Sequence, residues 1–215
     1  MMSTDPLIDR LATDLRPVRR RTPWRDATIL LVLGIIEIAW VVSAGLMRPD
    51  MPHAMHMPSF WWKTAGLAAV AVISGVTALL SLSPTRSPRR GLRIVGGVAF
   101  LMLGAGWLVD ALQAGGPAVL WHRLDPAHGL VCARKIVELS LPLALALGLL
   151  ARRGAPVDSH GTAWAAGIAA SAFGALTFAL ACPFDDPLYL AVWYLSAGGV
   201  VTLATRLVLP WLTRW

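Results

Sequence analysis

Residues 27–47 read ATILLVLGIIEIAWVVSAGLM, a run of apolar or small residues in which Glu37 is the one charged side chain. A helix of about 20 such residues spans the hydrocarbon core of a bilayer. Five more stretches of this kind follow, at about 61–82, 92–113, 136–151, 161–181 and 188–209. The fourth is the shortest, and an earlier start of its helix stays open. We therefore expect an all-α polytopic membrane protein, a bundle of six transmembrane helices.

The composition of the whole chain supports this fold class. Of its 215 residues 56% are hydrophobic and 14% charged, and its mean hydropathy is +0.63. About 120 apolar positions suffice for about six spans and leave almost nothing for a water-soluble core. This excludes a cytosolic enzyme, a disordered regulator and a secreted disulfide-rich domain. The sequence also lacks a glycine-rich phosphate loop, a His-Glu-x-x-His motif and a nucleophile elbow, so we do not expect an enzyme.

The distribution of basic residues predicts the orientation. Six spans place fourteen of the nineteen Lys and Arg residues on one side, in the N-terminal tail, the second and fourth loops and the C-terminal end. The positive-inside rule puts both termini in the cytoplasm. The net charge of +7 is then an orientation signal, and we expect the lipid bilayer but no nucleic acid as a direct partner.

Residues 1–26 form a polar cytoplasmic tail, separate from the membrane domain of residues 27–215. Thr4 can cap a helix that Pro17 ends, which predicts a short amphipathic helix. Its apolar face holds Leu7, Ile8, Leu11 and Leu15. A helix of roughly 12 residues is marginal alone in water, so this one should order when its apolar face docks. The membrane surface, the protein's own loops and a cytosolic partner are all open as the docking surface.

Soft metal ligands gather on the opposite, outer side. The first outer loop holds Met51, His53, Met55, His56 and Met57, and later outer segments hold His122, His128, Cys132 and Cys182. Thioether, imidazole and thiolate groups select soft ions such as Cu(I). The two cysteines end adjacent loops, so a reversible or static disulfide is equally open, and the methionines also fit a plain interfacial role. No cofactor is required on this interpretation, and a soft metal ion is one possible ligand.

The interiors of the predicted spans have two features of note. Glu37 lies near the middle of the first span, where a carboxylate costs a few kcal/mol and marks a functional candidate. Protonation, pairing and a proton or metal relay all stay open for it. The small residues of 165–171 in the fifth span predict close helix packing.

Four features of the sequence are shared with a known family: the tail TDPLIDRLATDLRPVRR (residues 4–20), six spans, one cysteine before the fourth span and Cys182-Pro183 before the sixth. In these four features the chain resembles the NrsF family of membrane-integral anti-sigma factors. The resemblance implies a bacterial inner-membrane protein whose tail, including Val18, sequesters an extracytoplasmic-function (ECF) sigma factor. It also implies that periplasm-facing Cys132 and Cys182 are needed for the response to heavy-metal or oxidative stress. Family members often carry a histidine after the tryptophan of the sixth span, where this chain has Trp193-Tyr194.

These interpretations combine into one hypothesis and one alternative. Metal binding or oxidation at Cys132 and Cys182 would change the packing of the fourth and sixth spans, alter presentation of the leucine-faced helix and release the sigma factor. The alternative is a small soft-metal transporter or metal-handling membrane protein that captures an ion with Met55, His56 and Met57 and passes it to Glu37. Apart from Glu37, the centres of the spans are apolar, which favours the regulator.

Overall fold

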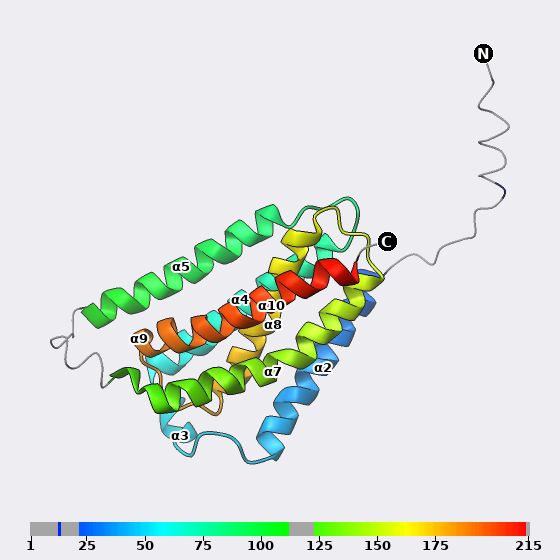
Figure 1. Ribbon diagram of the computed structural model, residues 1–215. Coiled ribbons are helices and arrows are strands. Elements are labelled where there is room, and N and C mark those ends of the chain that lie inside the picture. The colour runs from blue at the N-terminus through cyan, green and yellow to red at the C-terminus, as the bar shows by residue number, and fades with distance from the viewer. Residues whose placement is uncertain (1–12, 14–21, 112–122, 214–215) are drawn as a thin grey trace.

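The computed structural model describes residue 13, residues 22–111 and residues 123–213. Every regular element in these residues is a helix, which confirms the all-α prediction. The long helices are α2 (Pro23–Ser43), α4 (Pro58–Ser81), α5 (Arg89–Ala111), α7 (Pro126–Arg152), α8 (Ser159–Ala179) and α10 (Leu195–Leu212). A short helix, α3 (Met51–Ala54), precedes α4, while α9 (Pro187–Tyr189) and the π-helix η1 (Leu190–Tyr194) lead directly into α10 (Figure 1).

Prolines and aspartates determine where several helices begin. The first turns of α2, α4, α7 and α9 each contain a proline. Backbone N–H groups in a first turn have no acceptor within the helix, so a proline there costs no hydrogen bond. Asp125 caps α7 by accepting from the backbone N–H of His128 at 3.4 Å. α7 therefore begins at Pro126 and not near residue 136, where its apolar run begins. This is the earlier start left open for the fourth helix.

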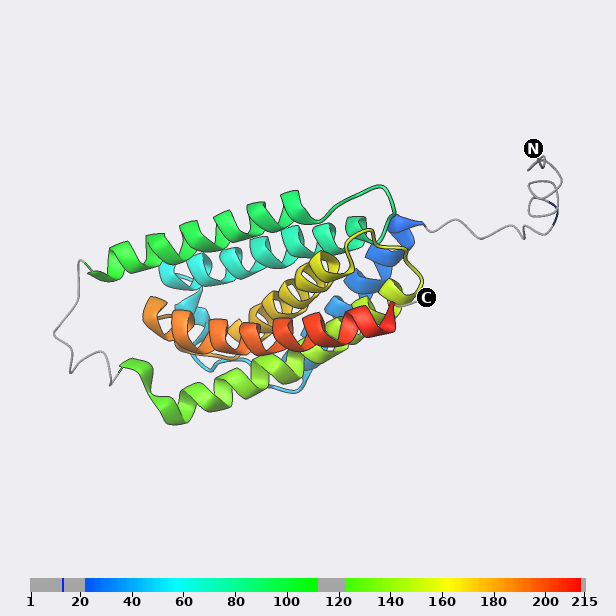
Figure 2. The ribbon, with the colours of Figure 1, turned by 45° about the horizontal axis from the view of Figure 1, so that its top comes forward.

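Helix α8 forms the centre of the bundle, with α4, α7 and α10 packed around it (Figure 2). Its small residues allow the close approach: a Cβ on Gly167 would lie 2.7 Å from the Cα of Thr202 on α10. A Cβ on Gly174 would lie 2.8 Å from the backbone nitrogen of Ser140 on α7. The close packing predicted for residues 165–171 is confirmed, because α8 could not keep these distances with larger side chains.

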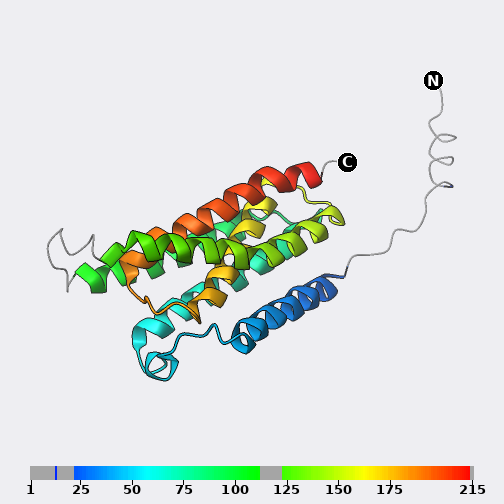
Figure 3. The same cartoon turned by 60° about the horizontal axis from the view of Figure 1, so that its bottom comes forward.

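Two helices lie at the edges of the bundle. α5 packs mainly on α4 (Figure 2), and α2, which lies at the edge of the bundle in Figure 3, packs mainly on α7. Many large apolar side chains of α2 face outward, among them Leu31, Ile35 and Ile36. Such outward apolar faces suit a lipid environment better than water.

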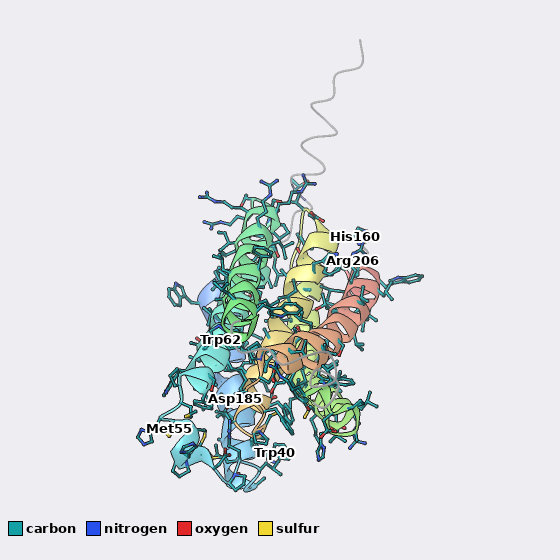
Figure 4. All side chains as sticks on the ribbon, turned by 90° about the vertical axis from the view of Figure 1, so that its left-hand side faces the viewer. Trp40, Met55, Trp62, His160, Asp185 and Arg206 are labelled. Atoms are coloured by element: carbon teal, nitrogen blue, oxygen red, sulfur yellow. The ribbon has the colours of Figure 1, made fainter. Side chains whose placement is uncertain are left out.

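Five segments are long and apolar enough to cross a membrane, namely α2, residues 89–108 of α5, α4, α8 and the continuous segment Pro187–Leu212. α7 is also long enough, but it carries Arg134, Lys135 and Glu138 within about one turn. The two sets of predicted loops lie at opposite ends of the bundle: His160 and Arg206 mark one end, and Trp40, Met55 and Asp185 mark the other (Figure 4). Apart from residue 13, the amphipathic helix predicted in the tail lies outside the described residues.

Candidate functional site: a buried cysteine pair

Two cysteines that are far apart in the sequence meet at the end of the bundle predicted to face outward. Cys132 lies in the second turn of α7, and Cys182 lies in the segment that joins α8 to α9. Their Sγ atoms are 4.0 Å apart, and both thiols are free and buried. The Tyr189 hydroxyl donates a hydrogen bond of 3.1 Å to the Cys132 sulfur. The structure thus brings together the two residues that the sequence proposed as a pair.

An apolar shell encloses the two sulfurs. Ile136 and Tyr189 have no exposed surface, and Leu190 and Tyr194 are almost fully buried in the same cluster. The Phe184 ring stacks on Tyr189 with the ring centroids 4.7 Å apart. Water therefore has little direct access to the thiols.

That segment is held in place by buried charges. Arg48 donates from Nη1 to the Cys182 carbonyl at 3.4 Å and to Asp185 at 2.9 Å, and from Nη2 to the Pro183 carbonyl at 3.2 Å. Lys63 donates to the Cys182 carbonyl at 3.2 Å and pairs with Asp185. Both cations are buried, with 5% of Arg48 and 1% of Lys63 exposed. We call Arg48, Lys63 and Asp185 the charge cluster.

The charge cluster is connected to the solvent by Asp50. Arg48 binds Asp50 in a bidentate fashion, with two N–O distances of 2.7 Å. Hydrogen bonding from Arg48 lowers the pKa of Asp50 to about 2. The same hydrogen bond raises the pKa of Arg48 above its ordinary value. Both groups stay ionised at neutral pH.

The electrostatic surroundings of Cys182 favour its thiolate. Hydrogen bonding from the Cys132 thiol lowers the pKa of Cys182, and the Tyr194 hydroxyl and the positive charge of Lys63 act in the same direction. The Tyr194 hydroxyl makes no hydrogen bond to any described residue, so it acts on Cys182 as a nearby dipole. Burial acts against this shift and raises the pKa, but the net effect favours the thiolate, the form that acts as nucleophile and metal ligand, at Cys182.

The turn that enters α7 is packed against η1. The Trp193 indole donates to the Leu124 carbonyl at 2.7 Å, and its ring lies so close to Gly129 that a Cβ there would be 2.0 Å from it. Arg123 pairs with Asp186 at 2.6 Å. A π-helical turn is a local irregularity that often marks a functional site. Here η1 brings Trp193 to the entry of α7 and Tyr194 to the cysteines.

The Met/His-rich loop does not join the cysteines. Met51 and His53 lie in α3, and His53, Met55, His56 and Met57 are exposed. His128 is exposed on α7, where it binds Asp125 at 2.7 Å, and His122 lies outside the described residues. Within residues 22–111 and 123–213, no three His, Cys, Asp or Glu side chains form a group that could hold a metal ion. A metal site in this loop stays a prediction.

Other residues singled out from the sequence are placed as follows. Leu7, Ile8, Leu11, Leu15 and Val18 lie outside the described residues. Glu37 is buried in α2, with 7% of its surface exposed. Neither of its carboxylate oxygens has a hydrogen-bond partner in the part of the chain that the structure describes.

The charge cluster was not predicted from the sequence. Arg48 and Lys63 belong to the five basic residues that the six-span prediction leaves on the outer side. The available signal was that Asp50 and Asp185 lie in loops on the same side, so that acids and bases of the outer loops can neutralise each other. Buried charges in proteins are paired, and counting both signs would have pointed to this cluster.

The separation of the sulfurs suits two kinds of chemistry. A disulfide needs an S–S distance of about 2 Å, so the sulfurs would have to approach by about 2 Å. Two thiolates that bind a thiophilic ion at about 2.3 Å each, as zinc is bound, would lie up to about 4.6 Å apart. The observed 4.0 Å lies between these values. Small movements of the Cys182 segment would serve either reaction.

Comparison with known proteins agrees with the features seen here. The family model NrsF, described as negative regulator of sigma F, matches residues 11–215. The anti-sigma-F factor NrsF of Caulobacter vibrioides (strain NA1000 / CB15N) is 34% identical over 219 residues, covering 100% of this chain and 98% of that protein. No solved structure matches the chain. The chain therefore belongs to the NrsF family of anti-sigma factors, whose role is regulatory and not enzymatic.

Proposed function

We propose that this anti-sigma factor crosses the bacterial inner membrane six times, with both termini in the cytoplasm, and sequesters an ECF sigma factor through its tail. The apolar face of Leu7, Ile8, Leu11, Leu15 and Val18 binds the sigma factor. The observation that carries the sensing role is the pair of free thiols, 4.0 Å apart. They lie near the start of α7 and just before α9, and both of these elements are at the end of the bundle opposite the start of α2 (Figure 1). In this arrangement a periplasmic signal reaches the cysteines while the sigma factor is held in the cytoplasm.

The signal acts on Cys132 and Cys182 by one of two reactions. With a hydroperoxide, the Cys182 thiolate takes one oxygen to become a sulfenic acid and releases an alcohol. The Cys132 thiol then displaces water and forms the disulfide. With a soft metal ion of the copper or cadmium type, both thiols lose their protons and coordinate the ion. Each reaction changes the distance between the sulfurs, so each moves the Cys182 segment.

The route from the cysteines to the tail runs through Arg48. Its backbone N–H donates to the Leu180 carbonyl at 3.1 Å, and its guanidinium binds the Cys182 and Pro183 carbonyls. Arg48 follows the C-terminal end of α2 by five residues, and α2 begins directly after the tail. A displaced Cys182 segment therefore pulls on the helix that presents the tail. Coupling of this kind needs two discrete arrangements of α2, which is the feature to test.

The tail is tested with the full chain in membranes. Leu11→Asp, Leu15→Asp places two charges on the apolar face, and Asp9→Ala changes the opposite face as a matched control. Sigma factors that co-purify with the wild type should be lost from the double variant and kept by the control. If the double variant retains them, or if no sigma factor co-purifies with the wild type, the tail does not bind one.

Membership in a family of regulators also weighs against the transporter alternative. Soft-metal transport needs ligands along several spans. In the described residues no group of three or more His, Cys, Asp or Glu side chains could hold a metal ion beside the exposed Met/His loop. The cysteines are better explained as a sensor than as one step of a conduction path.

A further inference from the structure

A cavity between α2 and α7 contains a buried carboxylate that the sensing mechanism does not use. Its volume is about 520 Å³, and its walls include Glu37 and Trp40 from α2 together with Pro142 from α7 and Phe178 from α8. Cavities of about 300–1,000 Å³ are typical of small-molecule sites. A bare metal ion would fill only a small part of this space.

Glu37 is the group in this cavity with unsatisfied hydrogen-bonding capacity. It is 7% exposed, and neither of its oxygens has a partner among the described residues. It lies six residues before Ser43, the last residue of α2. At 1.5 Å per residue this depth is about 9 Å from the outer end of the helix. A partner for Glu37 must therefore carry its polar group about 9 Å below this end of α2.

Pro142, a residue of the cavity wall, leaves one backbone carbonyl of α7 without its usual helical donor. Pro142 has no N–H, so it cannot donate to the carbonyl of Glu138, four residues earlier in α7. The side chains at the rim are occupied with one another: Glu138 pairs with Lys135 at 2.9 Å and with Arg134 at 3.1 Å. Lys135 also lines the cavity, but its ammonium group pairs with Glu138 and not with Glu37, so both Glu37 oxygens keep free acceptor capacity.

We propose that this cavity binds a lipophilic ammonium compound, a molecule with a compact apolar body and one cationic N–H donor group. The ammonium group would pair with Glu37 and donate to the Glu138 carbonyl. Trp40 and Phe178 supply ring surfaces for the cation and for the apolar body. A zwitterionic lipid headgroup fits less well, because its phosphate would have to enter the same apolar depth. The proposal rests on the cavity and Glu37 and does not rest on the chemistry of the cysteines or on sigma-factor binding.

Equilibrium dialysis of the full chain in nanodiscs, with empty nanodiscs as the background, tests the site. The probe is 1-adamantylamine, and 1-adamantanol is its uncharged counterpart of nearly the same shape. We expect the wild type to bind the amine at least about tenfold more tightly than the alcohol, because only the amine pairs with a carboxylate. Glu37→Gln should abolish this preference and leave binding of the alcohol unchanged.

Two further variants keep the test decisive. Asp9→Asn removes one negative charge from the tail and leaves the residues that line the cavity unchanged, so it should alter amine binding by less than about threefold. Leu139→Trp fills the cavity with an indole and leaves Glu37 in place, so it should weaken both probes. Equal binding of amine and alcohol to the wild type, or an amine preference that survives Glu37→Gln, would overturn the proposal. Binding no greater than that of empty nanodiscs would overturn it as well.

Discussion

Replacing Arg48 by methionine removes the group that ties the cysteine segment to α2. The side chain is 5% exposed and makes two bonds to Asp50, one to Asp185 and two to backbone carbonyls of the cysteine segment. Removing one partner of a buried charge network costs about 3–5 kcal/mol, because the remaining charges and carbonyls lose their partners. Asp185 keeps its pair with Lys63, so we expect a loss near the lower end, about 3 kcal/mol.

The assay is the free energy of unfolding of the purified full chain in detergent micelles, measured by denaturant titration. Arg134→Met is the matched control, because Arg134 pairs with Glu138 at 3.1 Å but its side chain is 70% exposed. An exposed pair contributes about 0–1 kcal/mol, so the control should be nearly as stable as the wild type. If Arg48→Met also lies within about 1 kcal/mol of the wild type, the charge cluster does not hold the segment.

Arg48→Met should also uncouple the sensor. With the Cys182 segment no longer attached to α2 through the guanidinium, treatment with cadmium or a hydroperoxide should release less sigma factor than in the wild type. Arg48→Lys restores the charge but not the bidentate geometry, so it should recover stability more than signalling. Full signalling in Arg48→Met protein that folds would remove Arg48 from the route.

Three further outcomes follow from the packing and the chemistry of the site. Gly129→Ala should destabilise the fold by about 1–3 kcal/mol in the same unfolding assay, since the added Cβ would meet the Trp193 ring. Gly75 faces open space, so the control Gly75→Ala should be neutral or slightly stabilising. Alkylation of Cys182, followed by mass spectrometry across a pH series, should rise at a pH below the value of about 8.5 for a free thiol, because the lowered pKa populates the thiolate earlier; a rise at or above that value would contradict it. Tyr189→Phe removes the donor to the Cys132 sulfur and should slow disulfide formation, measured by free-thiol titration after peroxide; an unchanged rate would show that this hydrogen bond has no part in it.

Hydropathy predicted the helices well because crossing a bilayer constrains composition over about 20 residues. The apolar runs at 61–82 and 161–181 correspond to α4 and α8 within a few residues. Hydropathy did not predict the start of α7, because this start depends on the Asp125 cap and Pro126 and not on apolar content. The sequence also indicated that Cys132 and Cys182 could meet, since both lie at the same end of the predicted bundle.

The surroundings of the cysteines could not be predicted in the same way. Lys63 is a cation near the end of a span, which usually reaches outward to water, yet it is 1% exposed. Its burial depends on Asp185, 122 residues later, and on two carbonyls of the cysteine segment. The π-helical turn that places Tyr194 beside Cys182 has no local sequence signal either. These features arise from tertiary packing and not from any local pattern.

The most direct test of the proposed sensor is the amount of sigma factor retained by the full chain in membrane vesicles before and after treatment with cadmium or a hydroperoxide. We predict that the wild type loses most of its bound sigma factor, while Cys132→Ser and Cys182→Ser variants retain it. Release from the serine variants at the wild-type level, or full retention by the treated wild type, would contradict a role for the cysteine pair in controlling the sigma factor.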